Sequence, residues 1–484
     1  MTTTSPNDTD DRCAAAVDAG QTWNATTRAF RAQVLRALAA ALDSRREDLV
    51  AVAARETHLP VQRLNGELTR TTYQLELFAE VLDEGSYLEV ILDSPGQTPA
   101  GPRPDLRRHL IPVGPVAVFA ASNFPFAFSV AGGDTASALA AGCPVIVKVH
   151  PGHLGTSVLT HEVLVGALVG CGAAAATVQL VGGFEAGLAL VRNAAVKAVA
   201  FTGSLAGGRA LSAAIAARPD PIPFFGELGS VNPVFVLPSA LTTDPSGVGT
   251  ALAESGVLGN GQFCTKPQFV FAPEGTAGDL LLEAMAAVYR GCPEREFLTP
   301  GIAASFDEGT TRLSHDPRLE VVVGGPGPAS PLLLGGAAED FAAIGSEEVF
   351  GPAQVVLRYA DPASLIGVVD ELSGSLTATV WTDPATDSPD REFCRALVTA
   401  LTRVCGRLLF NAVPTGVAVG WAQHHGGPWP STNSQHTSVG ATSIRRFLRP
   451  LVYQSAPAWL LPDELRGVKV PTRVDGRLVL PSGA

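Results

Sequence analysis

Val-Ala-Val-Phe-Ala, residues 116–120, is the first of four short apolar runs that decide the fold of this chain. Stretches with helical character separate the runs, around 129–141 and across 155–169. Short buried strands that alternate with helices predict a parallel sheet covered on both faces, with ligands beyond the carboxyl ends of its strands. The other three runs are Pro-Val-Ile-Val-Lys-Val (144–149), Thr-Val-Gln-Leu-Val (177–181) and Ala-Val-Ala-Phe-Thr (198–202).

Other parts of the chain have different patterns. Apolar residues at helical spacing predict an amphipathic helix within 27–56 and further helix through 73–81. Pro and Gly dominate 94–104, which favours a turn between extended segments. A second α/β region is predicted from strand-like runs at 233–237, 268–272, 354–358, 377–381 and 407–410.

Composition indicates a large enzyme-sized protein that acts on small molecules. The chain has 484 residues and a formal net charge of −12, which repels nucleic acid and anionic membranes. The acidic N-terminus lacks the pattern of a signal peptide, and no apolar run is long enough to span a bilayer, so we expect a cytoplasmic protein. Seven scattered cysteines predict neither a disulfide framework nor a zinc site. Adjacent His424 and His425 point apart, and no metal is predicted.

Gly-Gln-Phe-Cys-Thr, residues 261–265, places Cys264 in a setting suited to a nucleophile. A thiol reacts as its thiolate, so it needs backbone N–H groups or a cation nearby, and Lys266 is the nearest cation in sequence. Glu227 lies between Phe225 and Leu228, where desolvation would raise its pKa toward that of a general base. Taken singly, a buried cysteine or an ion-paired glutamate is the more common interpretation.

Five segments together resemble the aldehyde dehydrogenases in their order and rough spacing, over nearly the whole chain. The resemblance implies an α/β fold with a Rossmann-type cofactor domain, an α/β catalytic domain and a β-arm for oligomerisation. The segments are Ala-Ser-Asn-Phe-Pro-Phe (121–126), Phe-Thr-Gly-Ser (201–204), Glu-Leu-Gly-Ser-Val-Asn-Pro (227–233), Gly-Gln-Phe-Cys-Thr (261–265) and Glu-Glu-Val-Phe-Gly-Pro (347–352).

The resemblance implies domain boundaries as well as an assembly. We expect the dinucleotide-binding domain at 1–92 and 112–226 and the catalytic domain at 227–449. Segments 93–111 and 450–484 should be the oligomerisation arm and C-terminal tail, because apolar runs such as Ala-Trp-Leu-Leu-Pro (458–462) are costly if exposed. A homodimer or homotetramer is expected; the alternative is a tail that folds back onto its own subunit.

The resemblance also implies a reaction. Cys264 would attack an aldehyde, and Asn123 with the Cys264 amide would stabilise the oxyanion of the thiohemiacetal. After hydride transfer to a nicotinamide, Glu227 would activate the water that hydrolyses the thioester. The alternatives are an acylating, coenzyme A-dependent enzyme and a catalytically silent homologue.

Cofactor-binding positions follow from the same resemblance. Gly203-Ser-Leu-Ala-Gly-Gly208 differs from the Gly-x-Gly-x-x-Gly fingerprint, but glycine at a strand end still lets a pyrophosphate approach the N-terminus of a following helix. The matching residues are Lys148, Gly203, Ser204, Gly208, Leu228, Glu348 and Phe350.

The segment Lys148-Val-His-Pro151 departs from the commoner pattern of the family, in which a glutamate follows the lysine by three residues and excludes a 2′-phosphate. Here a 2′-phosphate would meet Lys148 and His150 or His153 instead of a repelling charge. We therefore expect NADP to be preferred, with NAD as the second cofactor.

Within the superfamily the chain looks most like NADP-accepting α-ketoglutarate semialdehyde dehydrogenases and bacterial long-chain aldehyde dehydrogenases. The aromatic residues Phe128, Phe263, Trp421 and Trp429 are candidates to line an apolar tunnel for a long aldehyde. Alternatively, an arginine would hold a distal carboxylate, with Arg445, Arg446 and Arg449 as candidates.

Overall fold

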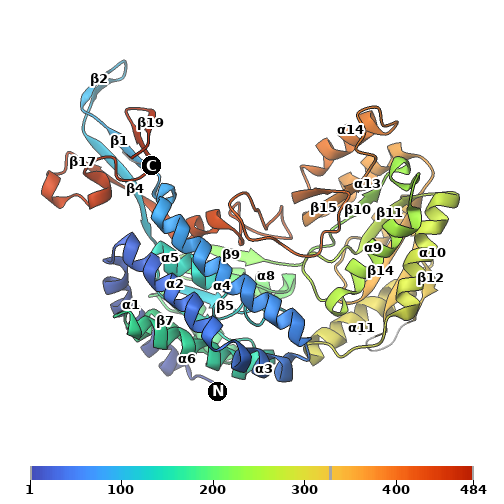
Figure 1. Ribbon diagram of the computed structural model, residues 1–484, viewed down its shortest axis with the longest axis horizontal. Helices are drawn as coiled ribbons and strands as arrows, with labels where there is room; N and C mark the ends of the chain where they lie inside the picture. Colours follow the sequence, from blue (N-terminus) through green and yellow to red (C-terminus); the bar gives the residue numbers. More distant parts are fainter. Residues whose placement is uncertain (1–2, 326–329, 482–484) are drawn as a thin grey trace.

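The computed structural model describes residues 3–325 and 330–481 as two lobes, each built around its own sheet, and an arm that projects from the first lobe (Figure 1). The predicted α/β fold class is confirmed by this architecture.

The first lobe contains a parallel sheet with strand order β7-β6-β5-β8-β9. Side chains of its central strands alternate between two cores: Val116 and Val118 pack into one, and Ala117 and Phe119 into the other. This alternation places apolar residues at every position of a strand that helices cover on both faces. The strands are β5 (Val116–Phe119), β6 (Val145–Lys148), β7 (Val178–Val181), β8 (Ala198–Thr202) and β9 (Phe224–Glu227), connected through α5 (Gly133–Ala141), α6 (Leu154–Gly170), α7 (Phe184–Arg192) and α8 (Leu205–Ala216).

Four N-terminal helices pack around this lobe: α1 (Pro6–Asn24), α2 (Arg28–Ser44), α3 (Arg46–Thr57) and α4 (Val61–Glu84). The single helix predicted within 27–56 is divided at Arg45, which lies outside helical geometry with φ −111° and ψ 19°. Both parts bury leucines in the same core, including Leu38 and Leu49.

The second lobe contains a seven-stranded sheet with order β12-β13-β14-β11-β10-β15-β16, in which only β12 is antiparallel. Its strands are β10 (Val234–Val236), β11 (Phe269–Pro273), β12 (Glu320–Val323), β13 (Leu332–Ala337), β14 (Ala353–Tyr359), β15 (Ser375–Trp381) and β16 (Cys405–Phe410). Its helices are α9 (Pro245–Val257), α10 (Thr276–Gly291), α11 (Pro300–Ser314), α12 (Phe341–Ile344), α13 (Leu365–Glu371) and α14 (Arg391–Leu401).

The projecting arm is a sheet with order β17-β4-β1-β18-β19 and a small β2-β3 hairpin (Figure 1). Strands from the C-terminal tail pair with strands of the same chain: β17 pairs antiparallel with β4, and β18 pairs parallel with β1. Apolar side chains nevertheless stay exposed here, with Trp459 76% and Leu478 64% exposed. The strands are β1 (Val90–Asp93), β2 (Gly96–Thr98), β3 (Gly101–Arg103), β4 (Leu106–Pro112), β17 (Leu448–Gln454), β18 (Thr472–Val474) and β19 (Arg477–Val479).

Candidate active site

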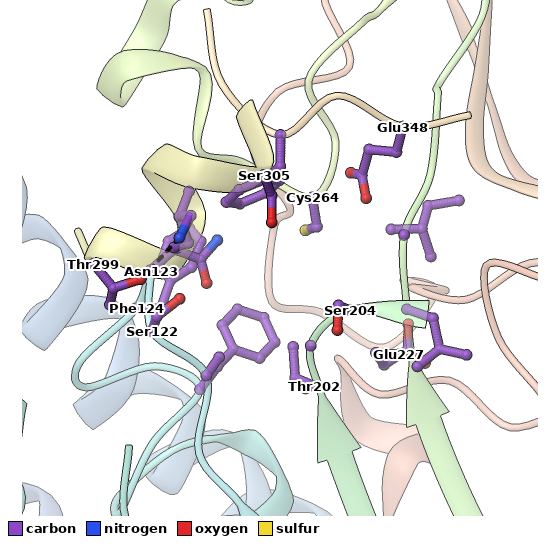
Figure 2. Close-up of a pocket in the computed structure, with 18 of the residues that line it drawn as sticks. Ser122, Asn123, Phe124, Thr202, Ser204, Glu227, Cys264, Thr299, Ser305 and Glu348 are labelled. Carbon is purple, nitrogen blue, oxygen red and sulfur yellow. Dashed lines mark hydrogen bonds between the residues drawn. The ribbon is translucent and has the colours of Figure 1, made fainter. Parts of the chain in front are cut away.

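A cavity of about 340 Å³ collects most of the predicted site residues from segments far apart in the sequence. Its lining includes residues 121–124, 202–204, 227–229, 264, 299, 301, 302, 305, 348 and 350. Figure 2 shows Cys264 between Asn123 on one side and Glu227 and Glu348 on the other.

The loop that carries Cys264 is held by an unusual backbone. Gly259, Asn260 and Gly261 are consecutive residues with positive φ, between 58° and 63°. A Cβ atom at Gly261 would lie 2.2 Å from the carbonyl carbon of Gly351, so only glycine allows this close approach. Glycine is therefore required before the cysteine, as the sequence predicted. The close approach of Gly261 to Gly351 joins the Cys264 loop to the segment that carries Glu348.

The Cys264 thiol is largely desolvated. Burial raises its pKa to about 12, and the carboxylates of Glu227 and Glu348 act in the same direction. The cations that lower the pKa are Arg70 and Arg407. The Cys264 Sγ also lies 3.6 Å from Nε2 of His425, whose pKa burial lowers to about 3, so the neutral imidazole can accept a hydrogen bond from the thiol.

Lys266 does not provide the cation expected beside the thiol. Its ammonium donates to the carbonyl oxygens of Val349 at 2.7 Å and Ala353 at 3.0 Å. Burial lowers its pKa to about 8, and Glu348 opposes that shift. Lys266 therefore ties the cysteine loop to the Glu348 segment through these two hydrogen bonds.

Glu227 ends β9 and is nearly buried, with 7% of the residue exposed. Burial raises its pKa well above the ordinary value, and Asp134 adds to the shift, while Arg446 and a hydrogen bond from Ser438 oppose it. Its Oε2 has no partner among the described residues. The expected direction of the pKa shift is thus present, and desolvation is its main cause.

Asn123 is also buried, and its Nδ2 donates to the carbonyl oxygen of Gln262 at 3.0 Å. That bond uses one of the two amide hydrogens. The loop after Asn123 is fixed by Glu67 on α4, whose Oε1 accepts from the amides of Phe126 at 2.7 Å and Ala127 at 2.9 Å. The carbonyl oxygen of Asn123 accepts from Arg63 at 2.7 Å, which holds the other side of the turn.

The N-terminus of α8 opens into the same cavity. Ser204 caps the helix by accepting from the Gly207 amide at 3.2 Å, and Gly203 and Ser204 are exposed. The free amides of the first turn and the helix dipole favour an anion such as a pyrophosphate. Gly208 has a different reason to be glycine, because a Cβ there would lie 2.4 Å from a methyl group of Leu228.

Glu348 and Phe350 also line the cavity. A Cβ at Gly229 would lie 2.4 Å from Oε2 of Glu348, so the carboxylate rests directly on this glycine. Burial raises the pKa of Glu348 to about 7, while Lys266 and the Ser230 amide oppose the shift. The carboxylate therefore lies beside a backbone that leaves space for it.

Lys148 and the histidines after it lie outside the cavity lining. Lys148 is at the end of β6 and burial lowers its pKa. His153 is fully buried, and its ring nitrogens contact the Ser157 hydroxyl and the Ala121 carbonyl, so it is not available to a phosphate as the sequence suggested. His150 is half-buried, and its Nδ1 accepts from the Gly152 amide, which leaves Nε2 to carry the proton.

The structure separates the candidates for the far end of the substrate. Phe128 lines the cavity, whereas Trp421 and Trp429 are about half exposed and absent from its lining. Arg446 is buried in an ion pair with Asp134 at 2.7 Å, and Arg445 pairs with Glu89 at 3.2 Å. These two arginines are therefore engaged elsewhere.

Sequence reasoning missed several residues of the site. His425 was considered only as a metal ligand, and Arg70 and Arg407 gave no signal because each stands alone in an unrelated segment. The start of α11 lines the cavity through Thr299, Gly301, Ile302 and Ser305; the N-cap pair Thr299-Pro300 was a signal that could have located this helix.

Among the described residues, no group of three His, Cys, Asp or Glu side chains could hold a metal ion. No helix in residues 3–325 and 330–481 is long and apolar enough to cross a membrane.

Comparisons with known proteins agree on one family. The model of the aldehyde dehydrogenase family matches residues 1–427. The chain is 43% identical to alpha-ketoglutaric semialdehyde dehydrogenase 2 of Azospirillum brasilense, over 97% of this chain and 91% of that one. It is 40% identical to the alpha-ketoglutaric semialdehyde dehydrogenase of Acinetobacter baylyi, over 95% and 89%. Aldehyde dehydrogenase 21 of Physcomitrella patens has a similar fold, with a TM-score of 0.78 at 20% identity over 94% and 92% of the two chains.

Proposed function

This chain belongs to the aldehyde dehydrogenase family, and we propose that it oxidises α-ketoglutarate semialdehyde to α-ketoglutarate with NADP as the preferred oxidant. The observation that carries the reaction is the convergence of Cys264, Asn123 and Glu227 on one buried cavity. The substrate rests on similarity to two relatives with this activity in their names.

In the proposed reaction the thiolate of Cys264 attacks the aldehyde carbon and forms a thiohemiacetal. The remaining amide hydrogen of Asn123 and the Cys264 backbone amide donate to the oxyanion, at the place where negative charge develops. Arg70 and Arg407 favour the thiolate against the burial that raises its pKa. Nε2 of His425, 3.6 Å from Sγ, can accept a hydrogen bond from the thiol and so orient it.

The cofactor would bind where the backbone leaves room for it, with its pyrophosphate at the amides of Ser204 and the first turn of α8. Glu348 and Phe350 would hold the nicotinamide half of the cofactor. Leu228 would line the wall between the pyrophosphate and the nicotinamide. When bound, the nicotinamide supplies the acceptor for the hydride that leaves the thiohemiacetal carbon. Cys264 is then left as a thioester.

Glu227 would complete the reaction by taking a proton from the water that attacks the thioester carbonyl. The products are the carboxylic acid and the free thiol. A coenzyme A-dependent enzyme would pass the acyl group to another thiol, and would not use such a carboxylate.

The proposed function is tested by following NADP reduction with α-ketoglutarate semialdehyde, with and without coenzyme A, and identifying the product. Turnover to α-ketoglutarate without coenzyme A supports a hydrolytic enzyme. A requirement for coenzyme A would assign the acylating reaction instead. Absence of turnover with this and other aldehydes would leave a silent homologue as the answer.

Cofactor preference should depend on Pro151, which is exposed at the start of a short 3₁₀ helix. Wild type should use NADP with a higher kcat/KM than NAD. Pro151→Glu should move the ratio toward NAD by roughly 10-fold or more, because a carboxylate there repels a 2′-phosphate. Pro151→Gln is the matched control, since it removes proline without adding charge and should keep most of the preference. A wild type that prefers NAD would contradict the prediction.

We further propose that the arm joins subunits through its exposed apolar side chains. Light scattering should give at least twice the chain mass of 50.0 kDa. Trp459→Arg should weaken association, whereas Val169→Arg, which changes a side chain 55% exposed on α6, should not. A stable, active wild-type monomer at micromolar concentration would show that the arm has another use.

A further inference from the structure

Helix α4 presents two charged side chains to the Asn123 turn, residues 123–127. Arg63 and Glu67 are four residues apart and therefore lie on one face of the helix. Nη2 of Arg63 donates to the carbonyl oxygen of Asn123 at 2.7 Å. Oε1 of Glu67 accepts from the amides of the last two residues of the turn, at 2.7 Å and 2.9 Å. The cation thus holds the start of the turn and the anion holds its end.

Arg63 also joins the Asn123 turn to the loop of the nucleophile. Its guanidinium carbon lies 5.3 Å from the centre of the Phe124 ring and 4.7 Å from that of Phe263, the residue before the nucleophile. These two rings meet edge to face, with their centres 5.4 Å apart. Asn123 adds another link, because its Nδ2 donates to the carbonyl oxygen of Gln262. The same face of α4 therefore fixes the oxyanion donor relative to the thiol.

The carboxylate of Glu67 is costly to place at this position. Only 5% of the residue is exposed, and burial raises its pKa to about 7, while its two backbone hydrogen bonds, Arg63 and Arg70 oppose the shift. Its Oε2 has no partner among the described residues, and both hydrogen bonds of Oε1 go to the Asn123 turn. An apolar side chain would pack here without the cost of burying a charge, but it would leave the two amides without an acceptor.

We propose that Glu67, together with Arg63, is a positioning residue for the oxyanion donor Asn123. Its carboxylate fixes the backbone that carries the Asn123 amide at the cavity (Figure 2). This inference rests on the proposed function, in which that amide stabilises the oxyanion of the thiohemiacetal, and it adds the residues that set the position of the amide. An oxyanion donor acts only at hydrogen-bond distance from the developing charge, and a displacement of about 1 Å can cost about 100-fold in rate.

Two substitutions of similar size test the acceptor. In Glu67→Met, which has none, NADPH formation in a single turnover with α-ketoglutarate semialdehyde should slow about 10- to 100-fold. Glu67→Gln keeps one carbonyl oxygen for the two amides, so it should recover most of this loss, to within about fivefold of the wild-type rate. Gln74→Met is the control, because it also replaces a buried polar side chain of α4 that has no hydrogen bond to the Asn123 turn. It should change the rate less than about twofold.

The Asn123→Ala background separates positioning of the amide from a general loss of structure. If Glu67 acts through that amide, adding Glu67→Met to Asn123→Ala should slow the single turnover by less than about a further twofold, since the amide is already absent. A merely structural role would give the same loss in both backgrounds and would overturn the proposal. An undiminished rate in the single variant Glu67→Met would overturn it as well.

Hydrogen exchange at the amides of residues 123–127, followed by mass spectrometry, adds a measurement that does not depend on turnover. Exchange should be at least about 10-fold faster in Glu67→Met than in the wild type, and unchanged in Gln74→Met. Unchanged exchange in Glu67→Met would show that the carboxylate does not hold the turn. A wild type that oxidises no aldehyde would refute the proposed function, and the exchange rates would still decide whether Glu67 fixes the Asn123 turn.

Discussion

Cys264→Ala should abolish aldehyde oxidation, with a loss of kcat of at least about 10,000-fold, and leave NADP affinity nearly unchanged. Among the described residues that line the cavity, Cys264 is the one that carries a thiol, and the proposed reaction forms its covalent intermediate there. The proposed cofactor contacts lie elsewhere, at the start of α8 and at Glu348. Rates are read from NADPH absorbance and affinity from quenching of tryptophan fluorescence.

Removal of another cysteine provides the control for this prediction. Cys394 is half-buried on α14 and is not part of the cavity lining, so Cys394→Ala should keep full activity. The thiol reagent iodoacetamide should inactivate both the wild type and the Cys394 variant by alkylating Cys264. Substantial turnover by Cys264→Ala would show that another residue is the nucleophile.

Much of the first lobe was predictable because its strands bury both faces. Such strands consist mainly of apolar residues, and the runs at 116–120, 144–149, 177–181 and 198–202 fall on β5 to β8. Strand β9 (Phe224–Glu227) was missed, since Phe-Phe-Gly-Glu is short and ends in glycine and a charge. Helix α1 was not predicted: its first turns are acidic and were considered only as evidence against a signal peptide, although Ser5-Pro6 is a typical helix start.

The site was predictable where its residues form local motifs, and unpredictable where they come from separate elements. Gly261 and Cys264 share one loop, and the reason for the glycine is a close approach to Gly351. Arg70, Arg407 and His425 lie on α4, β16 and a late loop, so only the tertiary structure brings them to the thiol.

Lys266 shows how proximity in sequence can mislead. It lies two residues from Cys264, yet its ammonium points to the carbonyl oxygens of Val349 and Ala353. The cations that lower the pKa of the thiol, Arg70 and Arg407, are each more than about 100 residues from it in sequence. The strength of such an interaction depends on the distance between the charges in space and not on their separation in sequence.

Glu227→Gln should separate the two halves of the proposed reaction. Acylation of Cys264 does not need this carboxylate, so the variant should release about one equivalent of NADPH per active site in a rapid burst. Deacylation should then be slower than in the wild type by roughly 100- to 10,000-fold, because the general base is lost. The change keeps the size of the side chain. Glu80→Gln, at an exposed position on α4, is the control and should behave as wild type.

The pH dependence of deacylation tests whether Glu227 is the general base. In the proposed reaction Glu227 would activate water only in its ionised form, and burial raises its pKa well above the ordinary value for glutamate. In the wild type, the deacylation rate should therefore rise with pH through the pKa of Glu227 and be lost below it. The rise should be absent in Glu227→Gln, measured by single-turnover release of the acid from acylated enzyme. A variant with the same pH profile as wild type, or one with no burst, would show that the water is activated by another group.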